Sequence, residues 1–152
     1  MDTEFGAPTD PNTITKDEKL FALFAHLSVI LGGIVIPFVF WLTNKDKSKF
    51  VTYHSLQALW LHLSFLCLII LWIIAFFSLA FGFIYSIPSI AHKSSGPPLF
   101  LLILMIVLYA SIFLILLVYY GFGIYLAVKS YEGNLTRYPI IGKRVYKHVY
   151  GA

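Results

Sequence analysis

The stretch that decides the fold covers residues 50–92 and reads FVTYHSLQALWLHLSFLCLIILWIIAFFSLAFGFIYSIPSIAH. These 43 consecutive residues contain no Lys, Arg, Asp or Glu. A helix that crosses a bilayer needs about 20 mostly apolar residues, so this stretch is long enough. Working outward, 25 uncharged residues separate Lys19 from Lys45, and 35 separate Lys93 from Lys129. The three stretches together predict a polytopic integral membrane protein.

The composition supports this class and excludes others. Of the 152 residues, 59% are hydrophobic and only 12% are charged. That charged share is about half of the usual value for a soluble domain. Because Cys67 is the single cysteine, a disulfide framework is excluded as well. We therefore expect an all-α fold with three transmembrane helices over residues 20–42, 54–83 and 99–128.

The charge pattern divides the chain into three parts. Residues 1–15 are expected to form a flexible acidic tail, residues 16–128 the three-span domain, and residues 129–152 a basic cytoplasmic tail. The acidic start lacks the basic region and cleavage site of a signal peptide, so the first apolar segment is expected to remain. Thr15 and Glu18 have the spacing of a capping box, which predicts a helix that begins near Lys16.

The first apolar segment contains three helix-weakening residues in its second half: Gly32, Gly33 and Pro37. Glycine lowers helix stability and proline removes a backbone hydrogen bond, so a kink or break is expected there. One interpretation is a single kinked span. The other is a pair of half-helices that form a re-entrant hairpin.

The distribution of Lys and Arg predicts the orientation. The first loop and the C-terminal tail hold eight of these residues, whereas the N-terminal tail and the second loop hold three. Positive loops stay in the cytoplasm. Three spans then place the N-terminus outside and the C-terminus in the cytoplasm, in a multi-pass protein of the inner (cytoplasmic) membrane. A re-entrant hairpin would instead place the N-terminus inside.

Several polar side chains in the apolar segments are candidate sites, since such residues are costly in lipid. His26 and His62 come from two helices and could bind a haem iron axially, although hydrogen bonding between helices is the simpler interpretation. His26, together with His54 and Gln57, is expected to make structural or partner contacts. We expect His54 and Gln57 to hydrogen-bond to nearby backbone or to residues 133–139, where Tyr138 and Pro139 are the candidate contact residues.

The C-terminal tail combines basic and apolar side chains. Val145, Tyr146 and Val149 have helical spacing, which favours a short interfacial helix. Its positive neighbours are expected to contact anionic lipid headgroups: Arg137, Lys143, Arg144 and Lys147. Lipid is a sufficient partner for these charges, so no nucleic-acid partner is expected.

The chain resembles the Tic-twenty-like family, a bacterial domain of unknown function related to a chloroplast inner-envelope import component. The resemblance rests on short motifs in a shared order: Ala25-His26-Leu27, Gly32-Gly33, the basic loop of residues 44–49, residues 54–59 and residues 133–139. It covers about residues 16–142. The resemblance implies a membrane location and a possible link to protein transport.

The sequence shows no pattern of residues that is typical of catalysis. The spans contain no Asp or Glu, and neither a phosphate-binding glycine loop nor a metal-spaced Cys/His cluster is present. We therefore expect no enzyme activity, no metal and no cofactor. The expected function is that of a membrane scaffold or accessory subunit, in a homo-oligomer or a larger complex. The alternatives are a carrier of b-type haem and a channel or transporter for a small solute.

Overall fold

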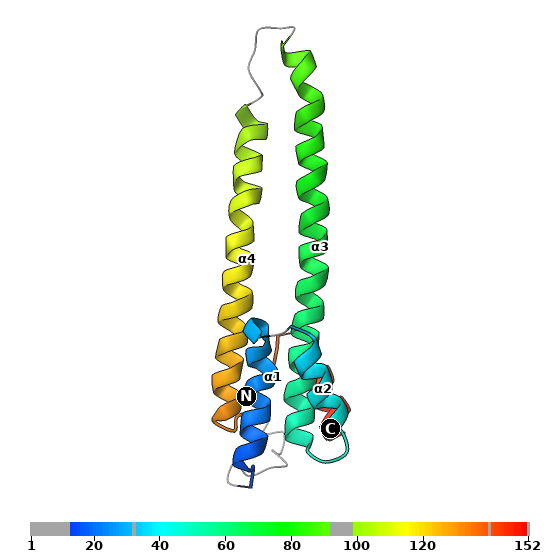
Figure 1. The fold of residues 1–152 in the computed structure, drawn as a ribbon, viewed down its shortest axis with the longest axis vertical. Helices are drawn as coiled ribbons and strands as arrows, with labels where there is room; N and C mark the ends of the chain where they lie inside the picture. The colour runs from blue at the N-terminus through cyan, green and yellow to red at the C-terminus, as the bar shows by residue number, and fades with distance from the viewer. Residues whose placement is uncertain (1–12, 32, 92–98, 140, 152) are drawn as a thin grey trace, which may run out of the picture. The chain divides into compact units, whose positions relative to one another are not determined.

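The computed structural model describes residues 13–31, 33–91, 99–139 and 141–151 (Figure 1). Every regular element in these residues is an α-helix, so the prediction of an all-α fold is confirmed. The elements in chain order are α1 (Lys16–Leu31), α2 (Val35–Asn44), α3 (Lys49–Ala91), α4 (Leu99–Tyr131) and α5 (Gly142–Tyr150).

The chain divides into two compact units. Unit 1 comprises residues 1–64 and 119–152, and unit 2 comprises residues 65–118. Helices α1, α2 and α5 belong to unit 1, whereas α3 and α4 contribute to both units. All charged side chains in the described residues lie in unit 1. The residues that were expected to contact lipid headgroups therefore share a unit with the histidines of the apolar segments.

Helix α1 begins at the predicted capping box. The Thr15 N–H donates to Oε2 of Glu18 at 2.8 Å, and the Glu18 N–H donates to the Thr15 hydroxyl at 3.2 Å. Just before the helix, Ile14 is buried and packs with Ala22 and Phe50. The last residues of the proposed acidic tail are thus fixed to unit 1, while residues 1–12 of that tail lie outside the described part.

The first apolar segment is broken into two helices rather than kinked. Gly33 has φ +57°, a left-handed conformation that glycine adopts readily, and its N–H donates to the Ser28 carbonyl at 2.8 Å. Pro37 falls in the first turn of α2, where its missing N–H costs little. The rings of Phe21 and Phe40 lie 5.2 Å apart, so α2 runs back along α1. The two half-helices therefore form a hairpin (Figure 1).

The expected three transmembrane helices are not confirmed. Two helical segments are long and apolar enough to cross a membrane, Lys49–Tyr85 and Leu99–Tyr131. At 1.5 Å per residue, the 16 residues of α1 extend about 24 Å and the 10 residues of α2 about 15 Å. Both fall short of the apolar core of a bilayer, which is about 30 Å thick.

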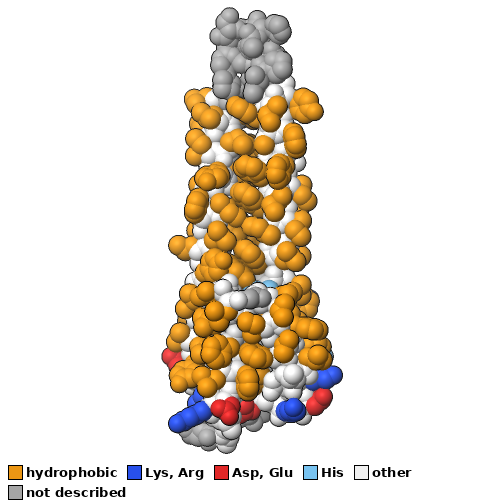
Figure 2. All heavy atoms as spheres, in the orientation of Figure 1, with side chains coloured by type: hydrophobic (Ala, Val, Ile, Leu, Met, Phe, Trp, Pro, Cys, Tyr) orange, Lys and Arg blue, Asp and Glu red, His pale blue; other side chains and the backbone are white. Residues whose placement is uncertain are grey.

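The exposed apolar surfaces of these two segments are typical of helices surrounded by lipid. In the most apolar stretch of each segment, none of the residues is buried. Figure 2 shows hydrophobic side chains over the outward faces of the helices, with charged side chains gathered at one end of unit 1. A core helix of a soluble protein would bury this surface, because large exposed apolar patches are rare in water.

Within unit 2, one tryptophan joins the two long helices. The indole N–H of Trp72 in α3 lies within hydrogen-bonding distance of two acceptors in α4, the Leu108 carbonyl at 3.2 Å and the Ser111 hydroxyl at 3.0 Å. The ring also stacks on Phe76 at 5.2 Å. A polar group in lipid is stabilised by such a bond between helices.

The hairpin also removes the basis of the expected orientation. The Ser48 hydroxyl donates to Oε1 of Glu18 at 2.6 Å, so the start of α1 lies beside the start of α3 in unit 1. The assignment of the N-terminus to the outside required the first segment to cross the bilayer. Because α2 returns the chain toward the end from which α1 begins, the start of α1 and the first loop lie at the same end of unit 1.

Candidate functional site

The first part of the candidate site is a pair of buried histidines in unit 1. Nε2 of His26 in α1 and Nδ1 of His54 in α3 are hydrogen-bonded at 3.1 Å. Both side chains are completely buried, and their rings meet edge to face with centroids 5.3 Å apart. The break after α1 brings them together, because a hairpin lets α1 lie against the first turns of α3.

A second polar group connects three helices of unit 1. The Ser28 hydroxyl donates to the Ala25 carbonyl at 2.7 Å and also lies 2.8 Å from Nε2 of His62. Since that hydroxyl proton is used, Nε2–H of His62 must be the donor to Ser28. A neutral imidazole has one N–H, so Nδ1 of His62 accepts from the Tyr119 hydroxyl. Helices α1, α3 and α4 are thereby linked through polar side chains.

Gln57 joins α3 to the segment that follows α4, as the sequence predicted. Its amide nitrogen donates to the Thr136 carbonyl at 3.1 Å, and its Oε1 accepts from the Tyr138 N–H at 2.8 Å. Gln57 is completely buried. The Tyr53 hydroxyl donates weakly to the same carbonyl, at 3.4 Å. A short loop without regular structure is thus held by side chains of α3.

The expected contact residues Tyr138 and Pro139 have different surroundings. The ring of Tyr138 lies 5.5 Å from that of Phe122 in α4, whereas Pro139 is exposed. The Pro139 carbonyl accepts from the Ile141 N–H at 2.9 Å, just before α5 begins. Pro139 therefore shapes the turn into α5, and Tyr138 makes the contact with another helix.

The arrangement does not fit the haem alternative. His26 is bonded to His54, and both nitrogens of His62 are engaged by Ser28 and Tyr119. An axial ligand needs a free imidazole nitrogen directed at the iron. Nδ1 of His26 and Nε2 of His54 have no hydrogen-bond partner in the described part of the chain. These two rings are bonded to each other through their other nitrogens, and His62, the second proposed ligand, has no free nitrogen. The described residues also include no group of three or more His, Cys, Asp or Glu that could hold a metal.

The carboxylate of Glu18 joins the start of α1 to the loop before α3. Glu18 receives hydrogen bonds from Thr15 and Ser48. Burial alone would raise the pKa of Glu18, but these hydrogen bonds outweigh it and lower that pKa below its usual value. The carboxylate is therefore held in its charged form between α1 and the first loop.

The basic residues of the tail divide into two groups. The predicted short helix is present as α5, and it packs Val145 and Tyr146 against Tyr53 of α3. The Arg137 guanidinium lies 5.0 Å from the centre of the Tyr146 ring, a cation–π contact within unit 1. The three other expected lipid contacts are exposed on α5: Lys143, Arg144 and Lys147.

Sequence reasoning missed the partners of the histidines. Ser28 and Tyr119 had no distinguishing feature, because a serine and a tyrosine in apolar helices are common and the two are 91 positions apart. Ser48 was likewise assigned only to a basic loop. The one available signal was the position of Ser28, two residues after His26, which places both in the same short helix.

The class of protein follows from these features. Two long exposed apolar helices, a hairpin of two shorter helices and a polar cluster buried among helices are typical of a small helical membrane protein.

The chain belongs to the MamF/MmsF family, described as the magnetosome magnetite crystal formation protein family, whose model matches residues 17–145. The match includes α1 to α4 and the first part of α5. No curated protein and no solved structure shows significant similarity to the chain. The inferred resemblance to the Tic-twenty-like family is therefore wrong, and the link to protein transport loses its support. The short motifs behind it, glycine pairs and aromatic residues at helix ends, recur in many membrane helices.

Proposed function

We propose that this chain is a non-enzymatic scaffold protein of the magnetosome membrane that takes part in forming magnetite crystals. The observation that carries the proposal is the family match over residues 17–145, which extends through both units. The scaffold role is supported by the use of the buried polar groups. His26, His62 and Gln57 hold helices and loops to one another and do not face a shared open site.

A genetic experiment tests this role. The chain is expressed in a magnetosome-forming bacterium from which its own MamF/MmsF family gene has been deleted. We expect the chain to localise with the magnetosomes and to restore the size distribution of the crystals, measured by electron microscopy. Normal membrane insertion at normal abundance, with crystals unchanged from those of the deletion strain, would contradict the proposal.

We also propose an orientation in which the start of α1, the first loop and the C-terminal segment all face the cytoplasm. Seven Lys and Arg residues of the first loop and C-terminal segment support the cytoplasmic side: Lys45, Lys47, Lys49, Arg137, Lys143, Arg144 and Lys147. The start of α1 belongs on that side because Glu18 is bonded to Ser48. The hairpin of α1 and α2 then enters the bilayer from the cytoplasm and returns.

The orientation can be measured by labelling single cysteines. In a Cys67→Ser background, Thr13→Cys and Lys47→Cys are both expected to react with an impermeant maleimide only in inverted vesicles. Reaction of the Thr13 variant in intact spheroplasts, with the Lys47 variant protected, would show that the first segment crosses the membrane.

A further inference from the structure

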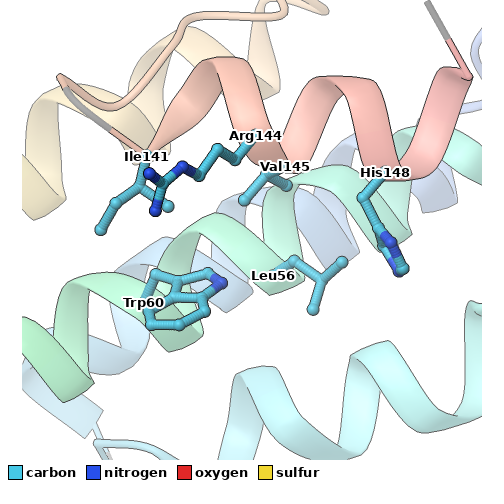
Figure 3. Close-up of a pocket in the computed structure, with 6 residues that line it drawn as sticks. All are labelled: Leu56, Trp60, Ile141, Arg144, Val145 and His148. Carbon is cyan, nitrogen blue, oxygen red and sulfur yellow. The ribbon is translucent and has the colours of Figure 1, made fainter.

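A pocket in unit 1 lies between α3 and α5. Its volume is about 400 Å³, and its walls are formed by Leu56 and Trp60 of α3 and by four residues at or in α5: Ile141, Arg144, Val145 and His148 (Figure 3). All of these residues belong to unit 1. None of the contacts described above for the histidine cluster uses this space.

The residues from α5 form a single stripe with two kinds of chemistry. Positions 141, 144, 145 and 148 follow the spacing i, i+3, i+4, i+7, which places them on one helical face. Ile141 and Val145 supply apolar surface, whereas Arg144 and His148 supply hydrogen-bond donors, and Arg144 is always charged. In Figure 3 the Arg144 side chain extends from α5 along the pocket above Trp60. The pocket thus has an apolar wall and a basic edge.

No acidic side chain in the described part of the chain balances the positive charge at this edge. Within the described residues, Glu18 is bonded to Thr15 and Ser48, and Glu132 is bonded to Lys129. None of the acidic side chains described in the structure forms an ion pair with Arg144. The Arg144 guanidinium, exposed beside apolar surface, therefore lacks a counter-charge among the described residues, and its planar fork suits the oxygens of a phosphate.

The position along α3 indicates the depth of the pocket. Trp60 is 11 residues beyond Lys49, the first residue of α3, which corresponds to about 16 Å of helix. Its side chain is 45% exposed, as expected for an indole at the boundary between headgroups and acyl chains. Helix α5 packs Val145 and Tyr146 against Tyr53, which lies one turn before Leu56 and closer to the charged loop.

We propose that the pocket binds one anionic phospholipid. The phosphate interacts with Arg144 and His148, and an acyl chain lies along Leu56 and Trp60. The combination of an unpaired cation and an adjoining apolar wall at the membrane boundary argues for a lipid rather than a soluble anion. This site is independent of the proposed role in magnetite formation, because it rests on α3 and α5 alone.

Quenching of Trp60 fluorescence by brominated lipids tests the site in the full chain. Trp41→Phe and Trp72→Phe leave Trp60 as the single tryptophan. In nanodiscs, brominated phosphatidylglycerol is expected to bind beside Trp60 about fivefold more tightly than brominated phosphatidylcholine, the ratio typical of one basic residue at an anionic surface. Arg144→Gln is expected to abolish this preference.

The matched control is Lys143→Gln, which removes the same charge from the same helix but does not line the pocket. It is expected to keep most of the preference. Equal loss in the two variants would show attraction to the surface charge only and would overturn the site. Equal quenching by both lipids in the single-tryptophan protein with Arg144 intact would also overturn it. So would reversal of the quenching by inorganic phosphate. Circular dichroism of each variant verifies that the helices are intact.

Discussion

Replacing Gln57 by leucine is expected to lower the free energy of unfolding by about 2 kcal/mol, since two membrane hydrogen bonds are lost. Leucine has nearly the same volume but neither donates nor accepts hydrogen bonds. The Thr136 carbonyl and the Tyr138 N–H would lose their partner in a region where Gln57 is completely buried. The measurement is an unfolding titration with SDS in mixed micelles, followed by circular dichroism.

The control for this variant uses the fact that the partners are backbone groups. Thr136→Ala and Tyr138→Phe retain the carbonyl and the N–H that bind Gln57, so neither should reproduce the loss. If Gln57→Leu leaves the unfolding titration unchanged, the loop of residues 133–139 does not depend on this side chain for its position.

Replacing Gly123 by leucine is expected to destabilise unit 1 by about 3 kcal/mol, the upper part of the range for an overpacked core. A Cβ at this position would lie 2.7 Å from Cγ1 and 2.8 Å from Cγ2 of Val29. Val29 is buried and β-branched, so its side chain has little freedom to move away. Helix α1 would have to separate from α4, which should appear as a lower melting temperature in detergent.

Gly121 provides the matched control, because a Cβ there would have no neighbour within 4 Å. Gly121→Leu should be neutral or slightly stabilising, since glycine weakens a helix. Adding Val29→Ala to the Gly123 variant should recover part of the stability by making space. Equal effects at the two glycines would mean that helix propensity, and not contact with α1, determines the result.

The parts of the fold that sequence reasoning predicted correctly depend on local chemistry. The capping box of Thr15 and Glu18 and the helical spacing of Val145 and Val149 lie within a few residues, and both describe real helix features. The glycine-rich break was also located correctly. Whether the chain kinks or reverses its direction at this break remained open, because Gly33 permits both conformations. The reversal depends on the burial of His26 against α3.

The contacts of the site were predictable only where two segments were expected on the same side of the membrane, which limited the number of partners. Gln57 and residues 133–139 were expected at the same side of the membrane, which left few other partners. The contact between His26 and His54 could not be deduced in this way, because it requires the hairpin that brings α1 against α3. The approach of Gly123 to Val29 joins positions 94 residues apart, and glycine itself gives no indication of its neighbour.

The bond between His26 and His54 has a direction, because a neutral imidazole carries its hydrogen on one nitrogen. If His26 is the Nε2 tautomer it donates, and His54 must then also be the Nε2 tautomer. If His54 donates from Nδ1, both rings are the Nδ1 tautomer. Neither ring can exchange tautomers alone and keep the bond, so the position of the hydrogen on His26 in α1 determines its position on His54 in α3.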